Sequence, residues 1–203
     1  MSEQTELTRE RILRTAQGLI LEKGYAGTSL ADIVGALGVT KGAFFHHFAG
    51  KDELARALIE RYAERDHFVF ADLARRADAL TDDPVQAALL FVSLFEELVA
   101  QRERPVRGCL FAAYVYQQGQ FAPEVRSFVH ATFDDWVGLF EAKLAAAIAA
   151  RPPRAPVTAR DLAEMMVALI EGAVILGRVF DDPKALARQA RLFRQYLKLL
   201  FDV

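Results

Sequence analysis

Residues 28–54 read TSLADIVGALGVTKGAFFHHFAGKDEL, and this stretch decides the fold. Thr28 and Thr40 are of a type that favours the N-cap of a helix, and a short apolar run follows each. Gly38 supplies a tight turn between the two runs, and Gly50 ends the second. Two short helices joined by a turn that contains glycine indicate a helix-turn-helix.

The second of these helices, expected over residues 41–48, has one side that points away from the protein. At about 100° per residue, Phe44 and Phe48 lie one turn apart and face the core. Gly42 and His46 point to the opposite side, where they can enter a DNA groove. The predicted DNA-contact residues are Thr28, Thr40, Lys41, Gly42, Ala43, Phe45, His46, His47 and Lys51.

The side chains on this outward side suit base edges. Lys41 and His46 can form hydrogen bonds with bases, and Phe45 can contact a thymine methyl group. These residues also have simpler explanations. Paired histidines on a short helix more often face solvent than read bases. Phe45 could equally pack on the next helix.

The helix starts offer contacts to phosphate. Thr28, Thr40 and Lys51 stand where free backbone N–H groups and the positive end of the helix dipole favour anions. Lys51 could instead form a surface charge pair with Asp52 or Glu53.

The stretch from Thr8 to Leu54, and residues 28–54 above all, closely resembles the DNA-binding region of the TetR family of bacterial regulators. Phe45 departs from the family pattern, which usually has Tyr, so a phenolic hydrogen bond to phosphate is lost. The roles that the resemblance implies are phosphate contact for Thr28, base contact for Lys41 and Gly42, a groove-facing position for His46, and backbone anchors at His47 and Lys51.

Composition sets limits on this interpretation. The chain of 203 residues is 53% hydrophobic and 26% charged, which suits a packed fold. Its formal net charge is −2, so a few placed cations, rather than a general positive coat, must bind DNA. One cysteine, no secretory signal and no long uncharged apolar stretch favour a cytoplasmic protein without a membrane span.

The rest of the chain also reads as helix. We expect an all-α protein with a helix-turn-helix DNA-binding domain at residues 1–50. A larger helical ligand-binding and dimerisation domain is expected at residues 51–203, with the fourth helix bridging the two. Further helices are expected at 8–23, 52–78, 84–104, 109–119, 123–150, 158–180 and 183–201, with a linker at 151–156.

The last two expected helices carry more apolar surface than one neighbour needs. In the final helix, Leu192, Tyr196 and Leu199 lie about 100° round from a first apolar stripe. Members of the TetR family dimerise through their last two helices as a four-helix bundle, which implies a homodimer here. Ordinary packing within one chain is the alternative.

An effector site is expected among the helices that cover residues 84–180. Aromatic residues gather there, including Phe91 and Phe140, although most of them should be core. The resemblance implies a small, mostly apolar effector. No cofactor is expected, and no metal either, because the adjacent His46 and His47 point about 100° apart on a helix. The candidate ligand-binding residues are Phe95, Cys109, Tyr114, Trp136, Met166 and Glu171.

Together these patterns predict a ligand-responsive repressor that leaves a pseudo-palindromic DNA operator when its effector binds. The sequence contains no nucleophile elbow, no phosphate-binding loop and no His-Glu-x-x-His motif, any of which would indicate an enzyme. Two alternatives stay open. One is a repressor in which Cys109, near Arg104 and Arg107, senses thiol-reactive compounds. The other is a helical interaction protein that does not bind DNA.

Overall fold

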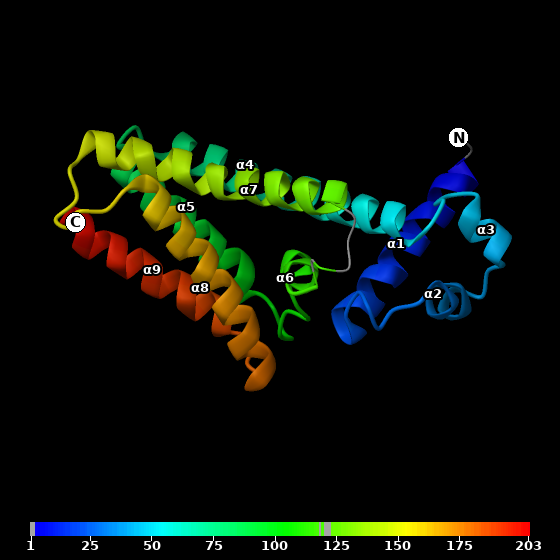
Figure 1. The fold of residues 1–203 in the computed structure, drawn as a ribbon. Coiled ribbons are helices and arrows are strands. Elements are labelled where there is room, and N and C mark those ends of the chain that lie inside the picture. Colours follow the sequence, from blue (N-terminus) through cyan, green and yellow to red (C-terminus); the bar gives the residue numbers. More distant parts are fainter. Residues whose placement is uncertain (1–2, 118, 120–122) are drawn as a thin grey trace. The chain divides into compact units, whose positions relative to one another are not determined.

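The computed structural model describes residues 3–117, 119 and 123–203, and within these residues the regular structure is helical (Figure 1). The predicted all-α class is therefore confirmed. The helices are α1 (Glu3–Lys23), α2 (Leu30–Leu37), α3 (Lys41–Phe45), α4 (Lys51–Leu80), α5 (Pro84–Ala100), α6 (Leu110–Val115), α7 (Pro123–Ala150), α8 (Ala159–Val179) and α9 (Ala185–Phe201).

The helices form two compact units. The first contains residues 1–64 and 108–132, and the second contains residues 65–107 and 133–203. Long helices α4 and α7 each contribute residues to both units. The predicted division at residue 50 stays a prediction, although the first unit also draws on a segment from the middle of the chain.

The first unit has the apolar core that the α1 pattern predicts. Ile12, Leu13 and Ala16 on α1 are fully buried, and α1 packs against both α2 and α6. The apolar stripe thus has a partner on each side, which fixes α1 within this unit. Helix α1 begins at Glu3, five residues before the expected start.

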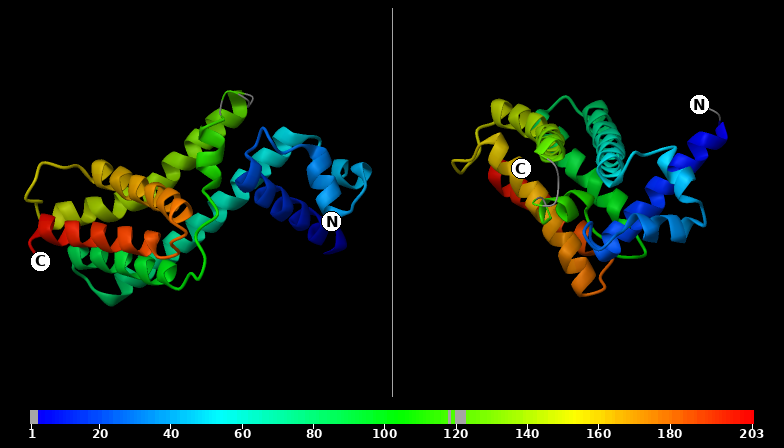
Figure 2. Two further views of the ribbon diagram at one scale, coloured as in Figure 1. Left: turned by 90° about the horizontal axis from the view of Figure 1, so that it is seen from below. Right: turned by 45° about the vertical axis from the view of Figure 1, so that its right-hand side comes forward.

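The second unit is built around aromatic rings. Phe140 is fully buried, and its ring lies edge-on to Phe70 with 4.9 Å between centroids. Phe91 and Trp136 also pack against Phe140, at 5.8 and 5.7 Å. Helices α8 and α9 lie side by side, and α9 also packs along α5 (Figure 2). These rings are part of the core, and their contacts hold α4, α5 and α7 together.

Several helix ends differ from the predicted ones by a few residues. Ser29, not Thr28, is the N-cap of α2, and it forms a capping box with Asp32. The predicted cap at Thr158 is confirmed, again as a capping box, with Asp161. Helix α6 is much shorter than the expected 109–119.

The linker after α7 is held by the end of α9. The backbone N–H of Arg154 donates to the Leu200 carbonyl at 2.8 Å, and the Arg151 guanidinium donates to the Phe201 carbonyl at 3.3 Å. The last carbonyls of a helix lack partners within it, so the linker satisfies groups that would otherwise need water.

The aromatic core predicts a large contrast between two phenylalanines. Phe140→Ala should lower the free energy of unfolding by about 3–5 kcal/mol, because it opens a cavity where several rings meet. Phe68→Ala, at a side chain that is 74% exposed on α4, should change it by no more than about 0.5 kcal/mol. Urea unfolding measures both, and similar losses would contradict this description of the core.

Candidate nucleic-acid interface

Two phenylalanines fix the direction in which α3 faces. Phe44 and Phe48 are 0% and 1% exposed, and their ring centroids are 5.8 Å apart. Helix α3 ends at Phe45, earlier than the expected residue 48. The Phe48 N–H still donates to the Phe44 carbonyl at 3.1 Å, so Phe48 keeps its place one turn after Phe44.

The opposite side of α3 is open, as predicted. Gly42 and His46 are exposed, and so is Lys41 beside them. Phe45 is 51% exposed and meets Phe44 edge-on, so it is only partly packed. Ala43 and His47, on the other flank, are half-buried.

The start of α3 has the predicted cap. Thr40 is exposed, and its hydroxyl accepts a hydrogen bond from the Ala43 N–H at 3.2 Å. This bond uses one of the free N–H groups of the first turn and leaves the Thr40 hydroxyl hydrogen available. Thr40 is therefore placed where it could also meet phosphate.

Thr28 lies inside the protein. Its side chain is 0% exposed, and its hydroxyl donates to the Gly24 carbonyl at 2.8 Å. The prediction that Thr28 caps α2 was wrong by one residue, because Ser29 takes that position. In this arrangement Thr28 stabilises the turn before α2, and its predicted phosphate contact stays a prediction.

Lys51 is bound to the turn between α1 and α2. Its Nζ donates to the Tyr25 carbonyl at 2.5 Å and lies 4.0 Å from the centre of the Tyr25 ring. Burial lowers the pKa of Lys51. The Tyr25 hydroxyl donates to Asp52 at 3.0 Å, and burial together with this carboxylate raises the pKa of Tyr25. The predicted phosphate contact of Lys51 therefore remains a prediction.

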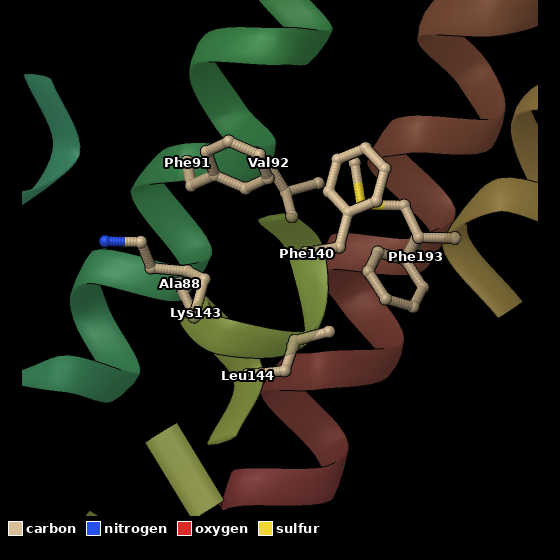
Figure 3. Close-up of a pocket in the computed structure, with 8 residues that line it drawn as sticks. Ala88, Phe91, Val92, Phe140, Lys143, Leu144 and Phe193 are labelled. Atoms are coloured by element: carbon tan, nitrogen blue, oxygen red, sulfur yellow. The ribbon is translucent and has the colours of Figure 1, made fainter. Parts of the chain in front are cut away.

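A small apolar cavity lies in the second unit (Figure 3). Its volume is about 10 Å³, which is room for roughly one water molecule. The Nζ of Lys143 is 2.5 Å from the Asp78 carboxylate, so mainly the aliphatic stem of Lys143 can line the cavity. The lining residues are Ala88, Phe91, Val92, Phe140, Lys143, Leu144, Met166 and Phe193.

The six candidate ligand-binding residues are not brought together at this cavity. Met166 lines it, while Phe95 and Trp136 pack in the aromatic core beside it. Glu171 is half-buried on α8. Two further candidates belong to the first unit: buried Cys109 at the start of α6, and Tyr114, whose hydroxyl donates to the Ala55 carbonyl at 3.5 Å.

Sequence reasoning missed part of the cavity wall. Phe91 and Phe140 belong to the aromatic cluster noted in the sequence, but Lys143 and Phe193 were not candidates. Lys143 interrupts an apolar face of α7, which is a signal that could have found it. Phe193 belongs to the regular stripe of α9 and carries no such signal.

Within the described residues, none of the helices has the length and apolar character that a membrane span requires.

Comparison with known proteins finds a family match for each of the two parts of the chain. The family described as "Bacterial regulatory proteins, tetR family" matches residues 12–58. The family described as "Tetracyclin repressor-like, C-terminal domain" matches residues 74–193. Together these matches cover the helix-turn-helix and most of the remaining helices.

Curated relatives are regulators of transcription. The chain is 23% identical to the repressor DhaR of Mycobacterium sp. (strain GP1), with 96% of this chain and 90% of that protein covered. It is 27% identical to the regulator LmrA of Bacillus subtilis, with 83% and 85% covered. It is 38% identical to the regulator CymR of Pseudomonas putida, with 42% and 44% covered. These relatives confirm the prediction of a regulator rather than an enzyme.

Solved structures share the fold. A TetR-family transcriptional regulator from Agrobacterium tumefaciens is 24% identical with a TM-score of 0.77, covering 95% of this chain and 98% of that one. A TetR transcriptional regulator from Chloroflexus aurantiacus is 28% identical with a TM-score of 0.73, covering 98% of both chains.

The buried hydroxyl of Thr28 yields a stability prediction. Thr28→Val keeps the side-chain volume but removes the donor to the Gly24 carbonyl. The free energy of unfolding should fall by about 1–2 kcal/mol, because a buried acceptor loses its partner. Urea unfolding measures this change. Unaltered stability would mean that the hydrogen bond is not formed in solution.

Proposed function

Because this chain belongs to the TetR family of bacterial regulators and is a ligand-responsive, DNA-binding regulator of transcription, we propose that the outward side of α3 reads its operator. Lys41 and His46 would form hydrogen bonds with base edges in the major groove, with Phe45 against a thymine methyl group. Thr40, His47 and Lys51 would contact the DNA backbone. Ala43 completes the proposed contact set, and Thr28, which is 0% exposed, would support it from inside by holding the turn before α2.

The size of Gly42 carries this proposal. A Cβ built at Gly42 would meet only the Thr40 hydroxyl, at an ordinary 3.8 Å, so the folded chain leaves room for a side chain there. Within α3, glycine costs stability relative to alanine. A residue that the protein itself does not need, on an exposed side between Lys41 and Ala43, favours close approach of an external partner.

Charge within the first unit supports recognition by a few contacts. Lys23 pairs with Asp32, Arg56 with Glu60, and Arg61 with Glu10, so these cations are already partly neutralised. Specific base contacts must then contribute more of the affinity than a general attraction to phosphate.

We also propose that the homodimer forms through α8 and α9. Regulators of this family typically dimerise and bind small effectors. On α8, Val179 is 68% exposed, and the adjoining Phe180 is 72% exposed; on α9, Leu199 is 73% exposed. Large apolar side chains exposed along two adjacent helices favour burial against a second copy. The dimer would set the two α3 helices about 34–36 Å apart, or a multiple of this, on a pseudo-palindrome.

The effector proposal concerns the apolar cavity of the second unit. Its lining favours an apolar compound, and its small volume requires side chains to move before most effectors can enter. Such a compound would select a state in which the DNA-reading helices are spaced differently. Shifting a population from 1:99 to 99:1 needs about a 10⁴-fold preference for that state.

The family assignment does not favour the two alternatives. Cys109 is 8% exposed, so a thiol-reactive compound would need the start of α6 to open first. A helical interaction protein is not favoured either, because the matched family and the relatives are regulators of transcription.

The first test places larger side chains at Gly42. An operator is selected from random duplexes with the wild-type protein, and its dissociation constant is then measured for each variant. Gly42→Leu should weaken binding by at least about 100-fold, because the side chain holds the helix away from the bases, a loss of about 2.7 kcal/mol. Stability should not fall, since the side chain enters open space.

Gly18 on α1 is the matched control, because a Cβ built there meets nothing within 4 Å and an added side chain again enters open space. Gly18→Leu should leave operator binding unchanged. Tight binding by Gly42→Leu would remove α3 from the interface.

The second test introduces charge on the proposed dimer face. Leu199→Glu should shift the protein from dimer to monomer and weaken operator binding, because a carboxylate would be buried between two copies. Analytical ultracentrifugation measures the oligomeric state. Leu80→Glu, at a residue 65% exposed at the end of α4, is the control and should remain dimeric. A dimeric Leu199→Glu protein would exclude this face.

A further inference from the structure

The turn between α1 and α2 determines where the helix-turn-helix begins. Gly24 has a φ of +78°, a left-handed conformation that glycine adopts readily, and its N–H donates to the Ile20 carbonyl. The Gly24 carbonyl accepts from Thr28, and the Tyr25 carbonyl accepts from Lys51. The partners in these hydrogen bonds all lie within the first 51 residues of the chain.

One bond to this turn comes from far along the chain. The Ala26 N–H donates to Oε1 of Gln117 at 2.7 Å, across a separation of 91 residues. The same amide lies against Gly24, because a Cβ built there would be 2.6 Å from Nε2 of Gln117. The side chain of Gln117 therefore spans the turn and holds its backbone.

Gln117 is itself held in place by the segment that carries it. The Tyr114 ring packs on Tyr25, with centroids 5.5 Å apart, and Phe111 packs edge-on against Tyr62 at the same distance. The Tyr114 hydroxyl donates to the Ala55 carbonyl. The segment is thus fixed to both the turn and the first half of α4, within one compact unit.

We propose that Gln117 is a positioning residue for DNA binding. It lies outside the proposed DNA-contact set, and it acts by fixing the turn from which α2 and α3 follow. Because α2 and α3 follow directly from this turn, a small movement of the turn should change where α3 stands relative to the groove. The inference rests on the proposed DNA-reading side of α3.

Two substitutions separate the hydrogen bond from the shape of the side chain. Gln117→Met has a similar length but no acceptor, whereas Gln117→Glu keeps an acceptor oxygen for the Ala26 N–H. Gln117→Met should weaken binding of the selected operator by about three- to tenfold, the effect of one hydrogen bond. Amide hydrogen exchange at Ala26 should become faster in the same variant. Gln117→Glu should stay close to wild type in both measurements.

Removal of a cation that contacts DNA phosphate lowers the salt dependence of binding. Gln117→Met removes no charge, so its salt dependence should equal that of the wild type. Circular dichroism and ultracentrifugation check that each variant is folded and dimeric. Gly42→Leu, measured in parallel, tests the proposed DNA-reading side by itself.

If Gly42→Leu still loses operator binding, the proposed DNA-reading side is supported. Three results would then overturn the inference about Gln117 alone. Ala26 exchange that is unchanged in Gln117→Met would mean that the bond does not hold the turn. Faster exchange with wild-type operator binding would separate the turn from DNA reading. Equal losses in Gln117→Met and Gln117→Glu would show that the acceptor oxygen is not the cause.

Discussion

The burial of Phe44 and Phe48 is the constraint on which the DNA-reading side depends. A helix of five residues has too few backbone hydrogen bonds to be stable alone, so its direction comes from tertiary packing. These two rings supply that packing, and the remaining positions of α3 are then free to differ in chemistry. Because the side of α3 opposite these rings does not pack on the core, it can carry a small residue at position 42 and polar residues around it.

The turn before α2 depends on hydrogen bonds from several separate parts of the chain. Its backbone groups are held by Thr28, by Lys51 and by Gln117, which lie at increasing distance along the chain. The helix-turn-helix is therefore not a self-contained stretch of sequence. Residues between Gly108 and Thr132 belong to the same compact unit, and α6 packs directly against α1.

Periodicity predicted what depends on neighbours in sequence. The outward direction of Gly42 and His46, the cap at Thr40 and the stripe on α1 all follow from residues within one or two helical turns. Contacts between distant residues could not be predicted in this way. Lys51 donates to the carbonyl of Tyr25, 26 residues earlier, and the Ala26 N–H donates to Gln117, 91 residues later, so no local pattern indicates either bond. The cavity wall combines four helices, so only Met166 among the six candidates lines it.

The composition of the first unit has a consequence for hybrid regulators. A chimaera that joined residues 1–50 to the C-terminal part of another regulator would lose the ring that packs on Tyr25 and the amide that spans Gly24 to Ala26. The foreign segment would have to offer an aromatic ring and an acceptor at matching positions. Exchange of DNA-binding parts between such proteins would therefore also depend on the short helix α6 and on the turn that follows it in the recipient chain.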